Sequence, residues 1–244
     1  MDNDVFDNDA LFVRQLYRDL LWHEGDDEGI AYWTEALGNA SMSRDQLVEF
    51  FINTEEFQGG VGTLTRLYEG ALGRAPDVCG LDYWMAQHAD GLNLAISAQV
   101  ILESDEFAQR QGDLSDDALI DTLTQSMLGR EATPDERGQW EQALANGTST
   151  GSLLLTLANS EDYRAQSAET VSLDLFYLGL LNREPDAAGR AYWQEEIADA
   201  DTPFTFIGSF FMSTEYHDRF LPPTESAALE LTGLAPNLDG LSGL

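Results

Sequence analysis

The residues best suited to chemistry recur at a fixed distance from a tryptophan. Arg74, Arg130 and Arg183 each stand ten positions before a tryptophan, and His23 takes that place before Trp33. A guanidinium binds an anion through two parallel hydrogen bonds, so these arginines could hold acidic sugars. They could equally pair with the acids that follow each tryptophan, and we favour this second interpretation because guanidinium suits half-buried pairing. The acids in question are Glu56, Glu106, Asp162 and Glu215.

Aromatic residues form the second candidate ligand surface. A tyrosine precedes the tryptophan in three places, at Tyr32–Trp33, Tyr83–Trp84 and Tyr192–Trp193. Neighbours on a helix point about 100° apart, so a buried tryptophan leaves its tyrosine near solvent. Trp22 lies outside the repeated position and is the aromatic residue freest to contact a ligand. The predicted ligand-binding residues are Trp22, Tyr32, Tyr83, Tyr192, Arg74 and Arg183.

The sequence offers little to catalysis. The three histidines stand in unrelated contexts, and HExxH, GxSxG and Cys–His sets are absent, so zinc and triad chemistry are excluded. The single cysteine, Cys79, permits no internal disulfide. Carboxylates are so numerous that a glycoside hydrolase stays a distant alternative on residue type alone. We therefore expect a non-catalytic protein.

Metal binding has equally little support. Acidic clusters occur at 2–9, 26–28 and 113–117, but none has the ligand spacing of an EF-hand loop. The glycines at 59–62 lack the aspartate of a calcium-binding RTX turn. We expect no metal site and no cofactor, apart from weak, non-specific binding of Ca²⁺ by the acidic surface.

The composition excludes several classes of partner. The 244 residues include 44 acids and 12 bases, all arginine, for a net charge of −32. Such a chain is repelled by nucleic-acid phosphates and by anionic lipid. The acidic start lacks the basic and apolar regions of a cleaved signal peptide, and no apolar run is long enough to span a membrane. A lysine-free acidic surface suits extracellular or particle-surface conditions, although it also serves plain solubility.

Four segments of the chain resemble one another. Each has an apolar helix-like run, a basic residue, a tryptophan and, 23 or 24 residues later, an aromatic in an acidic motif. The pattern predicts an all-α fold of four tandem three-helix repeats of about 50 residues, packed as a compact array. The array could be linear or wrapped into pairs. The predicted units are 1–58 with an acidic N-terminal cap, 59–112, 113–168 and 169–220, followed by a non-repeat tail, 221–244.

Capping residues should open the second helix of each unit, at Asp77 and Asp186 and through Thr133 with Pro134. Ser43 and the Thr202–Pro203 pair should open the third helix in units one and four. The tryptophans are interpreted as core anchors, and the later aromatics as plugs that fold back into the core. These structural anchors are Trp33, Trp84, Trp140, Trp193, Phe57, Phe107, Tyr163 and Tyr216.

The repeated residues resemble a bacterial family called domain of unknown function 4214. Its pattern, LYxxLLGRxPDxxGxxYW with FxxSxEF, is matched best by 67–84 with SDEF and by 175–193 with STEY. His23 and Gly25 depart from it in the first segment, and Glu136 replaces its glycine in the third. The resemblance implies a helical interaction module, similar in fold to the phycobilisome linker domain, found in exported and RTX-associated surface proteins and without enzymatic activity.

The resemblance and the composition together predict an adhesion module at a bacterial or virus-like particle surface that binds cell-surface polysaccharide. A structural linker for protein–protein assembly, including a homo-oligomer, is the alternative. The tail, 221–244, has three interpretations: a disordered end, a docking peptide that buries its leucines, or an uncleaved export signal.

Overall fold

The computed structural model describes residues 8–199, 210–211 and 213–220. Within these ranges the protein is helical and contains no strand, as the all-α prediction requires. No helix of the described part combines the length and apolar character needed to cross a membrane. The predicted cap at 202–203 and the tail from 221 onward lie outside the described residues.

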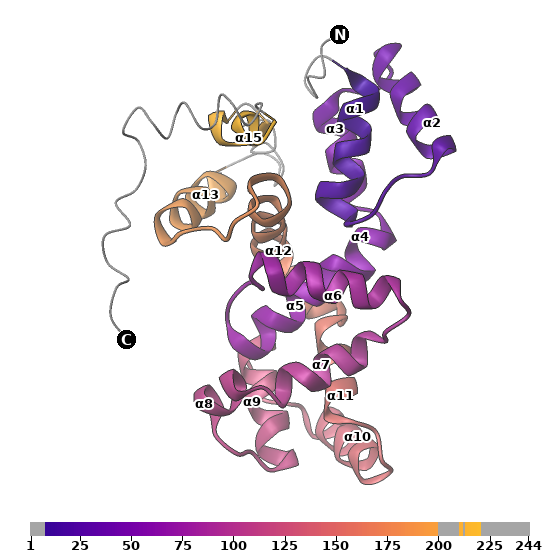
Figure 1. Cartoon of the computed structure of the whole chain (residues 1–244). Coiled ribbons are helices and arrows are strands. Elements are labelled where there is room, and N and C mark those ends of the chain that lie inside the picture. The colour runs from indigo at the N-terminus through magenta and orange to yellow at the C-terminus, as the bar shows by residue number, and fades with distance from the viewer. Residues whose placement is uncertain (1–7, 200–209, 212, 221–244) are drawn as a thin grey trace, which may run out of the picture.

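The same succession of helices recurs along the chain (Figure 1). The first segment contains α1 (Asp9–Leu16), the π-helix η1 (Tyr17–Leu21), α2 (Asp27–Gly38), α3 (Arg44–Ile52) and α4 (Glu55–Gly59). The second contains α5 (Val61–Leu72), α6 (Val78–Ala89), α7 (Leu94–Leu102) and α8 (Asp105–Gln111). The rest is α9 (Asp116–Leu128), α10 (Pro134–Ala145), α11 (Thr150–Ala158), α12 (Glu161–Leu181), α13 (Ala187–Asp199) and α15 (Thr214–Asp218).

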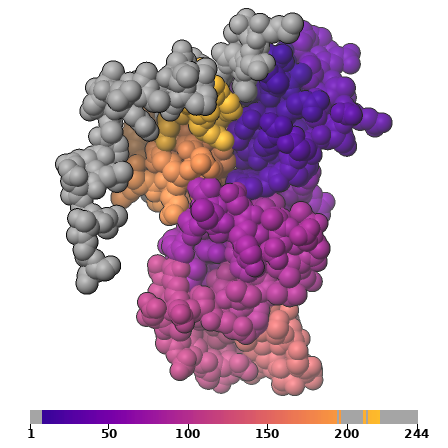
Figure 2. All heavy atoms as spheres, in the orientation of Figure 1, coloured from indigo at the N-terminus to yellow at the C-terminus, as the bar shows by residue number. Residues whose placement is uncertain are grey.

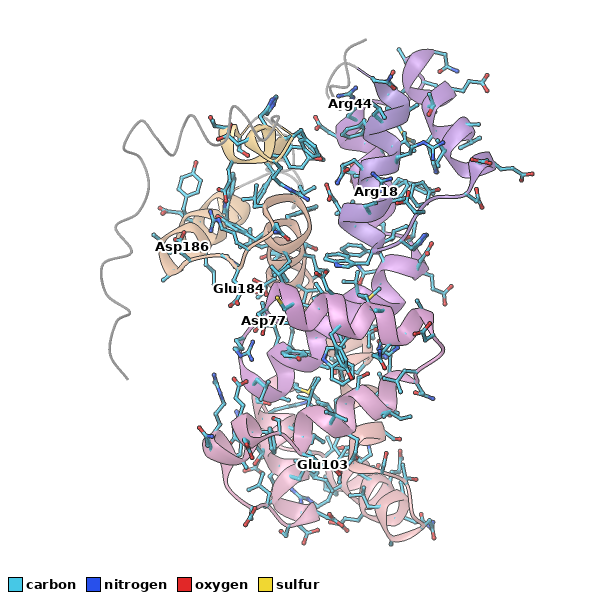
Figure 3. The ribbon with its side chains drawn as sticks, viewed as in Figure 1. Arg18, Arg44, Asp77, Glu103, Glu184 and Asp186 are labelled. Carbon is cyan, nitrogen blue, oxygen red and sulfur yellow. The ribbon has the colours of Figure 1, made fainter. Side chains whose placement is uncertain are left out.

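The caps lie where the sequence places them. The Asp77 carboxylate accepts a hydrogen bond from the Gly80 amide at 2.8 Å, and Asp186 accepts one from Gly189 at the same distance. Both aspartates are labelled in Figure 3. Thr133 and Glu136 form a reciprocal capping box at the start of α10, where Pro134 takes the first helical position. Ser43 forms another capping box with Gln46 at the start of α3. The repeated motif therefore works first as a helix-start signal.

The acidic motifs also begin helices. A Ser or Thr caps the new helix, and the aromatic three residues later turns inward, as at Ser104 and Phe107. This aromatic is buried in every segment: Phe57, Phe107, Tyr163 and Tyr216. The predicted plug is confirmed, because the cap reverses the chain and directs the next apolar side chain into the core.

Two predicted boundaries fall inside helices: the boundary between 58 and 59 cuts off the last residue of α4, and the boundary between 168 and 169 lies well within α12. Residues 168 and 169 both belong to α12, which runs for 21 residues from Glu161 to Leu181. At the corresponding earlier junctions a glycine ends the short helix, Gly60 after α4 and Gly112, with φ of 74°, after α8. No glycine follows Tyr163 before the next apolar run, so the helix continues.

The tryptophans are less buried than predicted. Trp84 is 7% exposed and belongs to the core, whereas Trp33, Trp140 and Trp193 are only half-buried and pack against its edge. The core anchors are instead the aliphatic residues of α5, α9, α11 and α12 and the buried plugs. An indole is large, and a helix lying on the surface of a small repeat cannot enclose it completely.

The array is wrapped rather than linear. Phe12 of α1 meets Phe211 edge to face at 5.4 Å between ring centroids. Gly179 lets α12 approach η1, since a Cβ at this position would lie 2.0 Å from the Asp19 carbonyl oxygen. Figure 2 shows the indigo first segment against the orange and yellow last segment, with the magenta second segment below both.

Candidate functional site

The repeated arginines are held in internal ion pairs. Arg74 donates two hydrogen bonds to Glu106, at 2.8 and 2.7 Å, and Arg183 donates two to Glu215, at 2.5 and 3.0 Å. The guanidinium of Arg74 holds the pKa of Glu106 below its usual range. These geometries favour the ion-pair interpretation of the arginines, because both forks of the guanidinium are occupied.

The departures from the pattern keep the same interaction in altered form. His23 Nε2 lies 2.6 Å from Glu56 Oε1, so histidine replaces arginine as the partner of that acid. Arg130 turns to Glu136 instead, with two hydrogen bonds at 2.8 and 2.9 Å, and lies 3.9 Å from Asp162. Glu136 also accepts from the Thr133 amide, and these contacts, the arginine's first, lower its pKa to about 2.

Three tyrosines stand in equivalent exposed positions. Tyr32, Tyr83 and Tyr192 are 65%, 57% and 55% exposed. Each packs edge to face on the following tryptophan, with centroids 4.7 to 5.2 Å apart. Tyrosines of the preceding helices orient two of these tryptophans. Trp84 Nε1 donates a hydrogen bond to the Tyr68 hydroxyl at 2.9 Å, and Trp193 Nε1 donates one to the Tyr177 hydroxyl at 3.1 Å.

A glycine makes room for this support. Gly189 faces the Tyr177 hydroxyl, which a Cβ would approach to 2.5 Å, and Gly29 faces the Tyr17 hydroxyl at 2.6 Å. The glycine of the motif is therefore needed for close approach of the tyrosine. In the second segment a Cβ on Gly80 would meet only the Asp77 side chain, from 3.4 Å, so this close approach is confined to the first and last segments.

One cavity lies where the first, second and last segments meet. Its volume is about 390 Å³, within the range of small-molecule sites. Arg18 belongs to η1, and Trp22 follows directly after it. Asp82 comes from α6, and Asn182 from the C-terminal end of α12. Arg18 is labelled on η1 in Figure 3. Each of three segments therefore contributes polar groups to one concave surface.

Local backbone geometry presents Trp22 to this cavity. The π-helix η1 ends at Leu21, and Trp22 has φ of 59°, a left-handed conformation that bulky residues rarely adopt. Trp22 Nε1 donates to Asp82 Oδ1 at 2.9 Å, and the ring edge lies 3.4 Å from the position of a Cβ on Gly179. Such strained residues cluster at functional sites.

A buried carboxylate closes the floor of the cavity. Asp19 of η1 contacts Arg219 at 3.1 Å, Gln15 at 2.7 Å and the Tyr216 hydroxyl at 3.3 Å. Burial raises the pKa of Asp19 to about 6, and Arg219 opposes that shift. Arg219 also donates to the carbonyl oxygens of Gly179 and Leu180. This network joins the first helices to the last across about two hundred residues of chain.

A second buried acidic cluster lies between α5, α12 and α13. Asp174 is fully buried, 2.6 Å from Arg190, which lies 4.0 Å from Glu69. Two carboxyl groups thus share one guanidinium. Burial, together with the adjacent Glu69, raises the pKa of Asp174 to about 8. Through Arg190 of α13, the buried carboxyl group of Asp174 connects α12 with α13.

The sequence predicts Trp22 and the three tyrosines as ligand contacts, and the structure adds four residues around Trp22 that the sequence did not suggest: Asp19, Asp82, Asn182 and Arg219. One signal was available for Asp19, an acid inside the apolar run LYRDLL. Asp82 and Asn182 carry no local signal, because only the wrapped arrangement brings them near Trp22. In the described ranges no three His, Cys, Asp or Glu side chains are grouped as metal ligands would be.

A comparison with known families matches two parts of the chain to one family. The model of Domain of unknown function (DUF4214) matches residues 4–61 and 98–167. The chain belongs to this family. The first matched range covers the first segment, and the second covers the end of the second segment and the third segment. The motifs at 74–84 and 183–193 lie outside both ranges. No curated protein matches the chain.

Proposed function

We propose that this DUF4214 protein is a non-catalytic adhesion module that binds cell-surface polysaccharide. The observation that carries the proposal is the set of three equivalent tyrosines, Tyr32, Tyr83 and Tyr192, each more than half exposed and oriented by a tryptophan. A fixed aromatic ring binds a sugar face with little loss of side-chain freedom. Repeated weak contacts on one chain suit a repetitive ligand, because avidity multiplies them.

The two arginines predicted as ligand contacts have a different role in this proposal. Arg74 and Arg183 are bidentate partners of glutamates, so their role in this proposal is to hold the acidic motif against the helix pair. The tyrosines and Trp22 remain as ligand contacts. The chain carries a net charge of −32, which suits a saline environment outside the cell, because salt screens the repulsion between its carboxylates.

The test is binding of fluorescently labelled protein to cells of the strain that encodes it, with and without their surface glycan, in salt. We expect glycan-dependent binding that falls at least ten-fold in the triple variant Tyr32→Ala, Tyr83→Ala, Tyr192→Ala. The matched triple Phe variant keeps the rings and should keep most binding. Equal binding to cells lacking glycan, or wild-type binding by the alanine triple, contradicts the proposal; circular dichroism checks that each variant is folded.

A second candidate function, protein–protein assembly, is favoured by one specific surface. Phe50 of α3 is 45% exposed and packs on Trp33 at 4.6 Å, which in turn packs on Tyr32. Exposed contiguous aromatic residues are typical of protein interfaces. Analytical ultracentrifugation of the wild type and Phe50→Ser tests this: a concentration-dependent oligomer that the substitution dissociates supports assembly, and a monomer at all concentrations argues against self-association.

A further inference from the structure

The cavity around Trp22 carries an inference about the class of sugar, which rests on the proposed function and makes it more specific. We propose that this cavity binds an uncharged sugar residue, and that the groups contacting it are the Trp22 ring, the Asp82 carboxylate and the Asn182 side chain. These groups come from η1's end, α6 and α12, so the ligand would bridge three segments.

The basic side chains that line the cavity already have partners within the protein. Arg18 donates two hydrogen bonds to Glu24, at 2.6 and 3.0 Å. Arg219 contacts Asp19 and two main-chain carbonyls. His23 is engaged through both ring nitrogens, with Glu56 and with the Glu24 carbonyl. An acidic sugar would therefore have to displace an existing carboxylate to gain a cationic partner.

The remaining groups suit hydroxyls. One oxygen of Asp82 accepts from Trp22, and no bond to its other oxygen exists among the described residues. The Asn182 side chain likewise has no hydrogen bond within the described part of the chain, and it is exposed at the C-terminal end of α12. A carboxylate accepts from hydroxyls, while an amide both donates and accepts, so together they can bind neighbouring hydroxyls of one ring.

Electrostatics selects against an anionic ligand. Asp82 faces the cavity with a carboxylate that no cation neutralises among the described contacts, and the chain as a whole carries −32. An acidic sugar would meet repulsion both near and far. The indole of Trp22 supplies the apolar face on which a pyranose ring packs.

The strained backbone offers a sharp variant. Asn182 has φ of 54°, a conformation that glycine adopts readily, so Asn182→Gly removes the amide without disturbing the helix end. Asn146→Gly, at the C-cap of α10 and away from the cavity lining, makes the same residue change at an ordinary φ of −87°, so it controls for loss of an asparagine side chain. Asp82→Asn removes the charge while leaving an oxygen to accept from Trp22.

The experiment uses ¹H–¹⁵N NMR, with the Trp22 indole resonance assigned by its loss in Trp22→Phe. Neutral gluco-, galacto- and manno-configured tetrasaccharides are titrated in turn, and tetragalacturonate serves as the acidic probe. We expect at least one neutral probe to shift the Trp22 resonance saturably, and tetragalacturonate to leave it unchanged. Asn182→Gly should weaken binding about ten-fold, the effect of one lost hydrogen bond, with Asn146→Gly unchanged.

The outcomes separate this inference from the adhesion proposal. A stronger response to tetragalacturonate, no response to any neutral probe, or full binding by Asn182→Gly overturns the inference. If the cavity fails while glycan-dependent cell binding persists through the tyrosines, the proposed function stands and only the site assignment is wrong. If cell binding is also absent, both are wrong.

Discussion

Raising the pH from 4.5 to 8.5 should destabilise the folded protein. Two buried aspartates, Asp19 and Asp174, have pKa values raised to about 6 and about 8, because burial disfavours their charged forms. The unfolded chain binds fewer protons than the folded chain between an ordinary aspartate pKa and these values. Stability therefore falls as pH rises through this window.

The magnitude follows from the pKa differences. For Asp19, the change from 3.8 to about 6 corresponds to about 3 kcal/mol, complete once the pH exceeds the folded-state value. About 2 kcal/mol of that loss falls between pH 4.5 and pH 8.5, most of it below pH 6. Asp174 acts in the same direction and extends the loss toward pH 8.

The assay is urea denaturation at fixed pH steps, monitored by circular dichroism. Measurements in 0.5 M NaCl separate the buried groups from the repulsion of the whole chain, because surface charges are screened and buried ones are not. Asp19→Asn and Asp174→Asn should each flatten the pH dependence, and Asp90→Asn, an exposed control on the end of α6, should not. Stability that rises with pH in salt, or wild-type slopes in both buried variants, refutes the reasoning.

Three further predictions concern acid, helix contact and the repeated ion pairs. Below about pH 4.5 stability should fall again, because Glu136 and Glu106 have lowered pKa values and protonation breaks their arginine contacts; the same urea series detects a maximum, and a monotonic curve argues against it. Gly179→Ala should lower the free energy of unfolding by at least about 2 kcal/mol, because the added Cβ would force α12 away from η1. Gly138→Ala, whose Cβ meets nothing within 4 Å, should raise it by up to about 1 kcal/mol. Equal effects of the two substitutions on thermal unfolding would contradict the close packing of α12 on η1. Arg74→Lys should cost about 1 kcal/mol by losing the bidentate pair with Glu106, and Arg14→Lys, in an exposed contact of 3.9 Å with Asp27, should change stability by less than about 0.5 kcal/mol.

The helix caps, the buried aromatic plugs and the fold class could be predicted from the sequence. Caps such as Asp77 and Thr133, the buried plugs and the all-α class depend on contacts within a few residues, and they are confirmed by the structure. The partial exposure of three tryptophans was misjudged, because burial depends on how much neighbouring surface covers a side chain. The exposed tyrosines followed from helical geometry alone.

The cavity belongs to the tertiary structure. Asp19 and Arg219 are 200 residues apart, and Trp22 and Asp82 are 60 apart, so no spacing rule connects them. Their proximity depends on the wrapped array and on Gly179, which admits the Asp19 carbonyl to the surface of α12. Sequence periodicity thus determined what each segment becomes, because helix and cap formation are local. Which segments meet was decided by long-range packing, because the closure of the chain is a property of all its helices together.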